Sequence, residues 1–160
     1  MSAPRVGPSR ERNPRRRRWV HGVGGPAGGG HARGHRFVIK KWDEQPYCES
    51  EGLPKLTRAS VQKTFTGEIE GEGTVEYLMM YRSDGSATFV GLERVSGRIA
   101  GRAGTFVLQR TGVFESGLAK ESYSVVPGSG TGELRGLRGE GGSAVGHGME
   151  HPFALNYDFD

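Results

Sequence analysis

The stretch from Thr74 to Val126 reads TVEYLMMYRSDGSATFVGLERVSGRIAGRAGTFVLQRTGVFESGLAKESYSVV and decides the fold. Its apolar, β-branched and aromatic runs are interrupted by short turn signals at Asp84-Gly85, Gly101-Arg102 and Ser116-Gly117. Asp-Gly favours a type I′ turn, because both central residues need positive φ and the resulting twist matches the flanking strands. The pattern predicts consecutive β-hairpins in one antiparallel sheet.

Two-residue turns at these positions also predict which residues face each other. The first turn places Glu76 opposite Glu93, the second places Glu93 opposite Arg110, and the third places Arg110 opposite Tyr123. We therefore expect these four side chains in one row on one face of the sheet. A slip of one residue at any turn would move the strand beyond it to the opposite face.

The same register predicts an apolar inner face on both sides of the row, made by Leu78, Met80, Phe89, Val95 and Leu108. It places a second apolar stripe on the outer face, made by Val75, Tyr77, Met79, Val90 and Leu92.

The rest of the chain adds further alternating segments. Strands are expected at 35–42, 57–66, 143–146 and 153–159. The last of these has an apolar face, which would stay exposed to solvent if the strand lay at a free edge of the sheet. We therefore expect it to pair with the first strand. This predicts an all-β, closed antiparallel barrel of about eight strands (35–160), in which closure removes both sheet edges. A two-sheet sandwich needs the same alternation and is the alternative.

Charge is unevenly distributed along the 160 residues. The net charge is +4, but eight of the arginines lie in residues 1–34 with only one acid, Glu11, so the remainder has more acids than bases. Nucleic-acid binding by the folded part is therefore not expected. The arm is rich in Arg, Gly and Pro and is predicted to be disordered. It is either a basic arm, a solvated tail, or a stretch upstream of a natural start at Val20 or Val23.

The single cysteine, Cys48, allows no internal disulfide and no cysteine-rich metal site. This favours a reducing compartment. No apolar run approaches the roughly 18 to 20 residues that a membrane span needs, and no secretion signal is apparent. We expect a cytoplasmic protein without membrane contact.

Two further motifs are only weak indications of a functional site. Residues 139–144 fit Gly-x-Gly-x-x-Ala but lack a strand–turn–helix context, so the Gly-rich segment 127–142 is interpreted as a closely packed loop with several positive φ values. His147 and His151 have the spacing of metal ligands on a helix, but Gly148 and Pro152 indicate a turn. No metal and no cofactor are expected.

The row of Glu76, Glu93, Arg110 and Tyr123 carries the chemical content. Two neighbouring carboxylates inside a barrel repel and are desolvated, which raises the pKa of one of them and allows a shared proton. Such a row could act as general acid or base, or bind the polar end of a ligand whose apolar part contacts Leu78, Met80 and Phe89. It could equally be a structural ion pair, or a row that faces solvent.

Four separated segments carry a resemblance to a known family: 55–61 (KLTRASV), 71–78 (GEGTVEYL), 89–95 (FVGLERV) and 128–134 (GSGTGEL). Together they resemble the bacterial family known as domain of unknown function 3224, over roughly residues 35–160. The family is similar in fold to the allene oxide cyclase barrels, which implies a closed barrel with a lumen. It often has histidine at the position of Arg110 and tryptophan at that of Tyr123, which implies charge pairing rather than proton transfer for Arg110.

The leading hypothesis is a barrel that binds a small, partly apolar ligand in its lumen, with cyclase- or isomerase-like catalysis left open. The alternative is a non-catalytic module that forms homo-oligomers through its outer apolar stripe. Binding of nucleic acid through the arm is the third hypothesis.

Overall fold

The computed structural model describes residues 18–20, 36–146 and 150–160. These residues form ten strands and one 3-10 helix, η1. The elements in chain order are β1 (Arg18–Val20), β2 (Arg36–Cys48), β3 (Lys55–Thr66), β4 (Ile69–Tyr81), β5 (Ala87–Ile99), β6 (Arg102–Glu115), β7 (Leu118–Val125), η1 (Gly132–Leu134), β8 (Leu137–Val145), β9 (Glu150–Pro152) and β10 (Leu155–Phe159). No helix among them is long and apolar enough to span a membrane.

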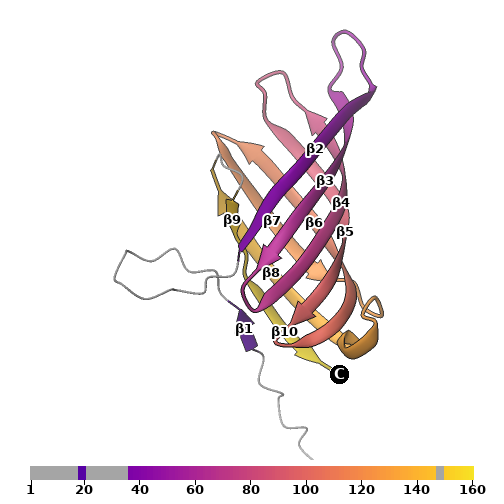
Figure 1. The fold of residues 1–160 in the computed structure, drawn as a ribbon. Helices are drawn as coiled ribbons and strands as arrows, with labels where there is room; N and C mark the ends of the chain where they lie inside the picture. Colours follow the sequence, from indigo (N-terminus) through magenta and orange to yellow (C-terminus); the bar gives the residue numbers. More distant parts are fainter. Residues whose placement is uncertain (1–17, 21–35, 147–149) are drawn as a thin grey trace, which may run out of the picture.

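The strands form one antiparallel sheet in the order β1-β10-β8-β7-β6-β5-β4-β3-β2-β9, curled into an open half-barrel (Figure 1). The all-β prediction is confirmed, whereas the closed barrel of about eight strands is not. The last strand, predicted at 153–159, begins at Leu155 as β10 and pairs with β8, not with β2 as predicted. The short strand β9, which precedes it, pairs with β2.

The first hairpin differs from its predicted form. Arg82 donates a backbone hydrogen bond to Ser86 (2.8 Å), so three residues form the loop instead of two. Gly85 has φ 85°, as the third residue of such a loop requires. Met79, not Met80, therefore lies opposite Phe89, and Glu93 faces Val75. This one-residue shift places β4 with the opposite face inward from the one predicted.

The second and third hairpins preserve the predicted faces. The second turn lies at Ala100-Gly101, one residue earlier than predicted, so Glu93 is opposite Leu108 and diagonal to Arg110. Glu93, Leu108 and Arg110 still share a face. Moving a two-residue turn by one position shifts the partner strand by two residues, and side chains two residues apart point to the same side. The third turn is as predicted, with Arg110 opposite Tyr123.

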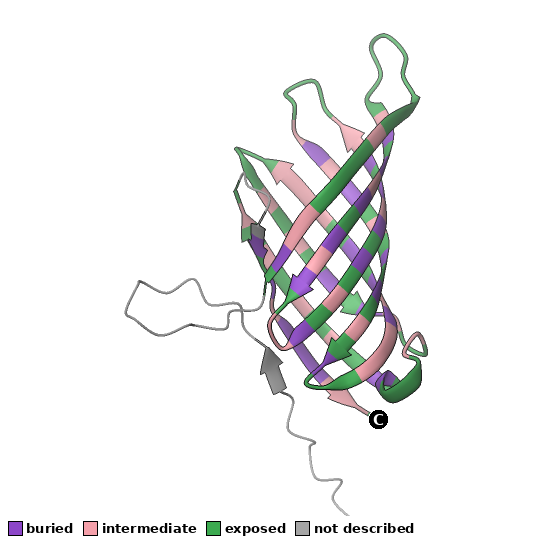
Figure 2. Cartoon of the chain, viewed as in Figure 1, coloured by how far each residue is buried: buried purple, intermediate pink, exposed green. Residues whose placement is uncertain are grey.

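Buried and exposed residues alternate along the strands (Figure 2). At one end of the half-barrel the Gly-rich segment 126–136 packs against β6, where Thr131 donates a backbone hydrogen bond to Thr105 (2.8 Å). It buries Leu134 completely. A Cβ added at Gly104 would lie 2.0 Å from the Thr131 carbonyl oxygen, so the predicted close crossing is confirmed. We call this end the packed end.

The packed end contains the larger apolar cluster, which includes Ile69, Ile99, Phe106, Leu134, Leu137 and Leu155. A second cluster lies toward the opposite end, which we call the hollow end. It is made by Ala59, Val61, Val75, Tyr77, Met79, Ala87 and Phe89.

Several element boundaries differ from prediction. The second predicted strand begins at Lys55, β4 begins at Ile69, before the stretch that starts at Thr74, and β8 begins at Leu137 within the predicted loop. Within residues 1–34, which are predicted to be disordered, the structure describes only Arg18–Val20, and this segment pairs with β10. The remainder of that arm lies outside the described residues.

Candidate functional site

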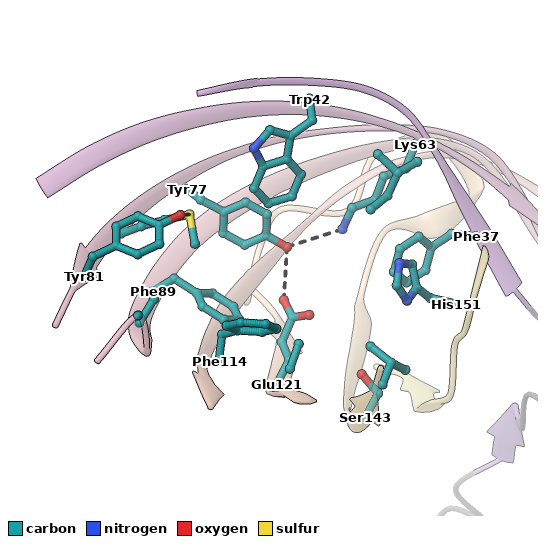
Figure 3. A pocket seen from close by; sticks show the side chains of 16 residues that line it. Phe37, Trp42, Lys63, Tyr77, Tyr81, Phe89, Phe114, Glu121, Ser143 and His151 are labelled. Atoms are coloured by element: carbon teal, nitrogen blue, oxygen red, sulfur yellow. Dashed lines mark hydrogen bonds between the residues drawn. The ribbon is translucent and has the colours of Figure 1, made fainter. Parts of the chain in front are cut away.

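A cavity of about 300 Å³ opens at the hollow end between β2–β7 and the end of β8 (Figure 3). It is lined by Phe37, Ile39, Trp42, Lys63, Tyr77, Met79, Tyr81, Gly85, Ala87, Phe89, Phe114, Ala119, Glu121, Ser143, Val145 and His151. Most of these side chains are apolar or aromatic, which is typical of small-molecule sites.

Two inward-facing glycines leave the space that the rings of Tyr77 and Phe89 occupy. A Cβ added at Gly91 would lie 2.7 Å from the Tyr77 ring, and one added at Gly112 would lie 2.4 Å from the Phe89 ring. The two rings contact each other edge to face, with centres 5.4 Å apart. Glycines on the neighbouring strands therefore let these rings lie across the sheet and form the wall of the cavity.

Lys63, Tyr77 and Glu121 form the polar floor of the cavity (Figure 3). The Lys63 Nζ lies 3.4 Å from the Tyr77 hydroxyl oxygen and donates to it. The same hydroxyl donates to Glu121 Oε1 at 3.1 Å. The three groups form a hydrogen-bonded chain from an amine to a carboxylate.

A layer of charged side chains continues below this floor. Glu93 accepts from Arg110 (Nη2, 2.6 Å) and lies 3.1 Å from the Lys63 Nζ. Arg110 Nη1 reaches Glu121 Oε1 at 3.2 Å. Lys63, Glu93 and Arg110 are buried and Glu121 is nearly so. Two cations and two carboxylates balance, as buried charges require.

Burial and charge shift the pKa values of this layer. Burial, together with the nearby Arg110, lowers the pKa of Lys63 to about 8, although Glu93 and Glu121 act in the opposite direction. Burial alone would raise the pKa of Glu93, but Arg110 and Lys63 hold it below its ordinary value. Burial raises the pKa of Tyr77 well above the usual range. At neutral pH Glu93 is thus ionised and Tyr77 neutral.

Tyr123 connects this layer to the C-terminal segment. Its hydroxyl donates to the carbonyl oxygen of Ala154 and accepts from the Ala154 N–H (3.1 Å). Its ring stacks on Phe153 with centres 5.0 Å apart. The Arg110 guanidinium lies 4.8 Å from the Tyr123 ring centre. Tyr123 therefore stabilises the segment between β9 and β10.

The profile of the family described as "protein of unknown function (DUF3224)" matches residues 34–157. The chain belongs to this family. A solved DUF3224 structure from Shewanella oneidensis MR-1, described as a protein with unknown function, is 34% identical in sequence. The match has a TM-score of 0.62 and covers 78% of this chain and 97% of that one. No curated protein matches the chain at a significant level.

The DUF3224 chain brings together three of the four residues of the predicted row. Glu93, Arg110 and Tyr123 are buried on one inner face, although they lie beneath the cavity and do not line it. Phe89 lines the cavity as predicted.

The other predicted site residues, Glu76, Leu78 and Met80, do not face the lumen. Glu76 accepts hydrogen bonds from Arg58 (3.0 Å) and Ser60 (2.8 Å) on the outer face. Leu78 is 49% exposed. The shared-proton pair of Glu76 and Glu93 is therefore wrong, because the three-residue first loop places them on opposite faces.

The predicted apolar stripe on the outer face is wrong in part. Val75, Tyr77 and Met79 are buried inside, whereas Val90 and Leu92 are exposed as predicted.

Sequence reasoning missed the polar floor of the DUF3224 cavity. Lys63 alternates with Ala59, Val61 and Phe65 on the inward face of β3, and a lysine on an apolar strand face was a visible signal. Glu121 lies two residues before Tyr123 and so shares its face. The predicted two-residue first turn gives the wrong face for Tyr77, as for the rest of β4.

The two histidines whose spacing resembles that of metal ligands are not both within the described residues. His147 lies outside the described residues, while His151 is buried and its ring lies 5.0 Å from that of Phe37. Within the described part of the chain, no group of three or more His, Cys, Asp or Glu side chains is placed to hold a metal ion.

Proposed function

We propose that this DUF3224 protein binds a small, mostly apolar molecule in the cavity at the hollow end, with a polar group of the ligand next to Lys63 and Tyr77. The supporting observation is the combination of aromatic walls with a buried, charge-balanced floor. Aromatic side chains bind a flat apolar body, and a few convergent polar groups fix its orientation.

The shape of the cavity favours a flat ligand. The Trp42 and Tyr77 rings lie nearly parallel, 6.2 Å apart and inclined by 25°. The Phe89 ring packs edge to face against Tyr77, and Phe114 also lines the cavity (Figure 3). A ligand with a conjugated or aromatic body would contact these rings and displace water from apolar surface.

The test uses 2-naphthylmethanol, a flat apolar probe with one hydroxyl group, in isothermal titration calorimetry. Ala119→Trp places an indole in the cavity, and we expect it to weaken binding at least about tenfold. Lys120→Trp adds the same side chain one position along β7, where Lys120 faces outward. Equal affinity of both variants and the parent chain would contradict the proposal.

Native mass spectrometry of freshly purified protein tests the same proposal without a chosen probe. A co-purifying small molecule that Ala119→Trp excludes and Lys120→Trp retains would support it.

A cyclase- or isomerase-like reaction is the finer form of this proposal. The chain from Lys63 through Tyr77 to Glu121 supports it, because such a chain can move a proton at the polar end of the ligand.

Self-association is the second candidate function, and the outer face of β4 and β5 favours it. Leu78, Val90 and Leu92 are 49%, 48% and 57% exposed, and Leu78 lies directly opposite Val90. Sedimentation equilibrium tests it: a homo-oligomer should dissociate on Leu92→Lys, and a monomer across the micromolar range would exclude it.

A further inference from the structure

Lys63 is positioned as a reactive amine and not only as a structural cation. It lines the cavity, yet its side chain is only 2% exposed. The Nζ contacts Glu93 on one side and the Tyr77 hydroxyl on another, and it lies 4.5 Å from the centre of the Phe37 ring. These contacts fix the amine at the inner end of an apolar cavity.

We propose that Lys63 condenses reversibly with an aldehyde or ketone group of the bound ligand to form a Schiff base. The inference rests on the proposed function, because the carbonyl compound must first enter the cavity. It adds the chemical class of the ligand and a covalent step.

The balance of charge favours a neutral carbonyl over a carboxylate. Glu93 and Glu121 already offset Lys63 and Arg110. A carboxylate ligand would bring a third anion next to two buried ones. The two cations are already offset, so no attraction would compensate for the free energy of desolvating that carboxylate. An aldehyde or ketone brings no charge.

The condensation needs no further reactant. The lone pair of Nζ attacks the carbonyl carbon, and the C=O π electrons move to the oxygen. The nitrogen gives up a proton and the oxygen takes one, which forms a carbinolamine. The C–O bond then breaks as the nitrogen lone pair forms the C=N bond, and the oxygen leaves as water with the second proton of the original amine. An amine and a carbonyl become an imine and water.

The floor of the cavity provides the path for these protons. The Lys63 Nζ donates to the Tyr77 hydroxyl, which donates to Glu121. Glu121 can accept the proton that leaves the nitrogen and return it through Tyr77 to the departing oxygen.

Glu93 stabilises the product. Its Oε2 lies 3.1 Å from the Lys63 Nζ, so it is placed as the counter-ion of a protonated Schiff base. The lowered pKa of Lys63, about 8, agrees with this role. About a tenth of such an amine is neutral at pH 7, far more than for an ordinary lysine.

The experiment compares 2-naphthaldehyde with 2-naphthylmethanol, which has the same ring system and no carbonyl. The full chain is incubated with each compound and sodium cyanoborohydride at pH 7, and peptides are mapped by mass spectrometry. Reduction of the imine gives a secondary amine heavier by the aldehyde less its oxygen atom. We expect labelling of Lys63 at least about tenfold above that of the surface residue Lys55, and none with the alcohol.

Two variants complete the test. Lys63→Arg keeps the positive charge and should abolish the cavity adduct, and Lys63→Met should do the same without the charge. Lys55→Arg should label like the parent chain. Labelling of Lys63 no greater than that of Lys55, with tight binding of the alcohol, overturns the Schiff base and leaves the proposed function standing. Failure of the alcohol to bind overturns both.

Discussion

The packed end and the hollow end use the same inward alternation with opposite results. At the packed end, Phe106, Ile69 and Ile99 fill the lumen and Leu134 covers it. At the hollow end, the inward residues of β5 and β7 include the small side chains of Ala87 and Ala119, and the cavity remains. The alternation therefore determines which side chains enter the lumen, whereas their volume determines whether the lumen is filled.

The charged layer of Lys63, Glu93, Arg110 and Glu121 separates the two ends. Apolar side chains pack against it from the packed end, and the cavity touches it through Lys63 and Glu121. Its buried charges are stable only as a balanced set.

The largest effect is expected at Glu93. Glu93→Gln leaves the Lys63 and Arg110 cations buried without their shared carboxylate, and the free energy of unfolding should fall by about 3–5 kcal/mol. Urea denaturation followed by circular dichroism measures this. A loss below about 1 kcal/mol would show that water reaches the layer and that it does not separate the two ends.

Leu134→Ala should be next, since it opens the packed end. Leu134 is fully buried, and its truncation should cost about 2–5 kcal/mol. The affinity for 2-naphthylmethanol should not change, because Leu134 does not line the cavity. Met79→Ala is the matched variant at the hollow end. Compared with Leu134→Ala, it should lower the free energy of unfolding less, since Met79 already borders the cavity, and it should weaken probe binding more. The reverse pattern would contradict the assignment of the two ends.

Lys63 gives the pH dependence. Its pKa falls from 10.5 in the unfolded chain to about 8 in the folded one. Between these values the unfolded state binds the extra proton, so the free energy of unfolding rises with pH, by up to about 3 kcal/mol. Lys63→Met should lose this rise. Denaturation between pH 7.5 and 9.5 tests it below the ordinary pKa of tyrosine, and equal slopes for both chains would contradict it.

The smallest effect is expected at Glu76, outside the barrel. Its pair with Arg58 is largely exposed, so Glu76→Gln should change the free energy of unfolding by less than about 1 kcal/mol. Probe affinity should stay unchanged. The contrast with Glu93→Gln tests the register directly, because the predicted two-residue turn would give both carboxylates the same importance.

An error in turn position and an error in turn length have different consequences for the predicted faces of the sheet. The sequence predicts the second turn one residue too late, yet Glu93 and Arg110 still share a face. It predicts two residues in the first turn where the structure has three, and Glu76 therefore lies on the outer face. Asp84-Gly85 fits either loop, since Gly85 adopts a positive φ in both. The sequence of that hairpin alone could not decide between them.

The sequence by itself determined an all-β chain of consecutive hairpins, a Gly-rich crossing that packs closely, and an inner face carrying Glu93, Arg110 and Tyr123. These follow from local rules, since turn residues and the period of two act between neighbouring strands. Only the tertiary structure decided that the half-barrel stays open, that Lys63 and Glu121 meet through Tyr77, and that one end is hollow. Those features depend on side chains from strands far apart in the chain and on the volume left between them, which no local pattern encodes.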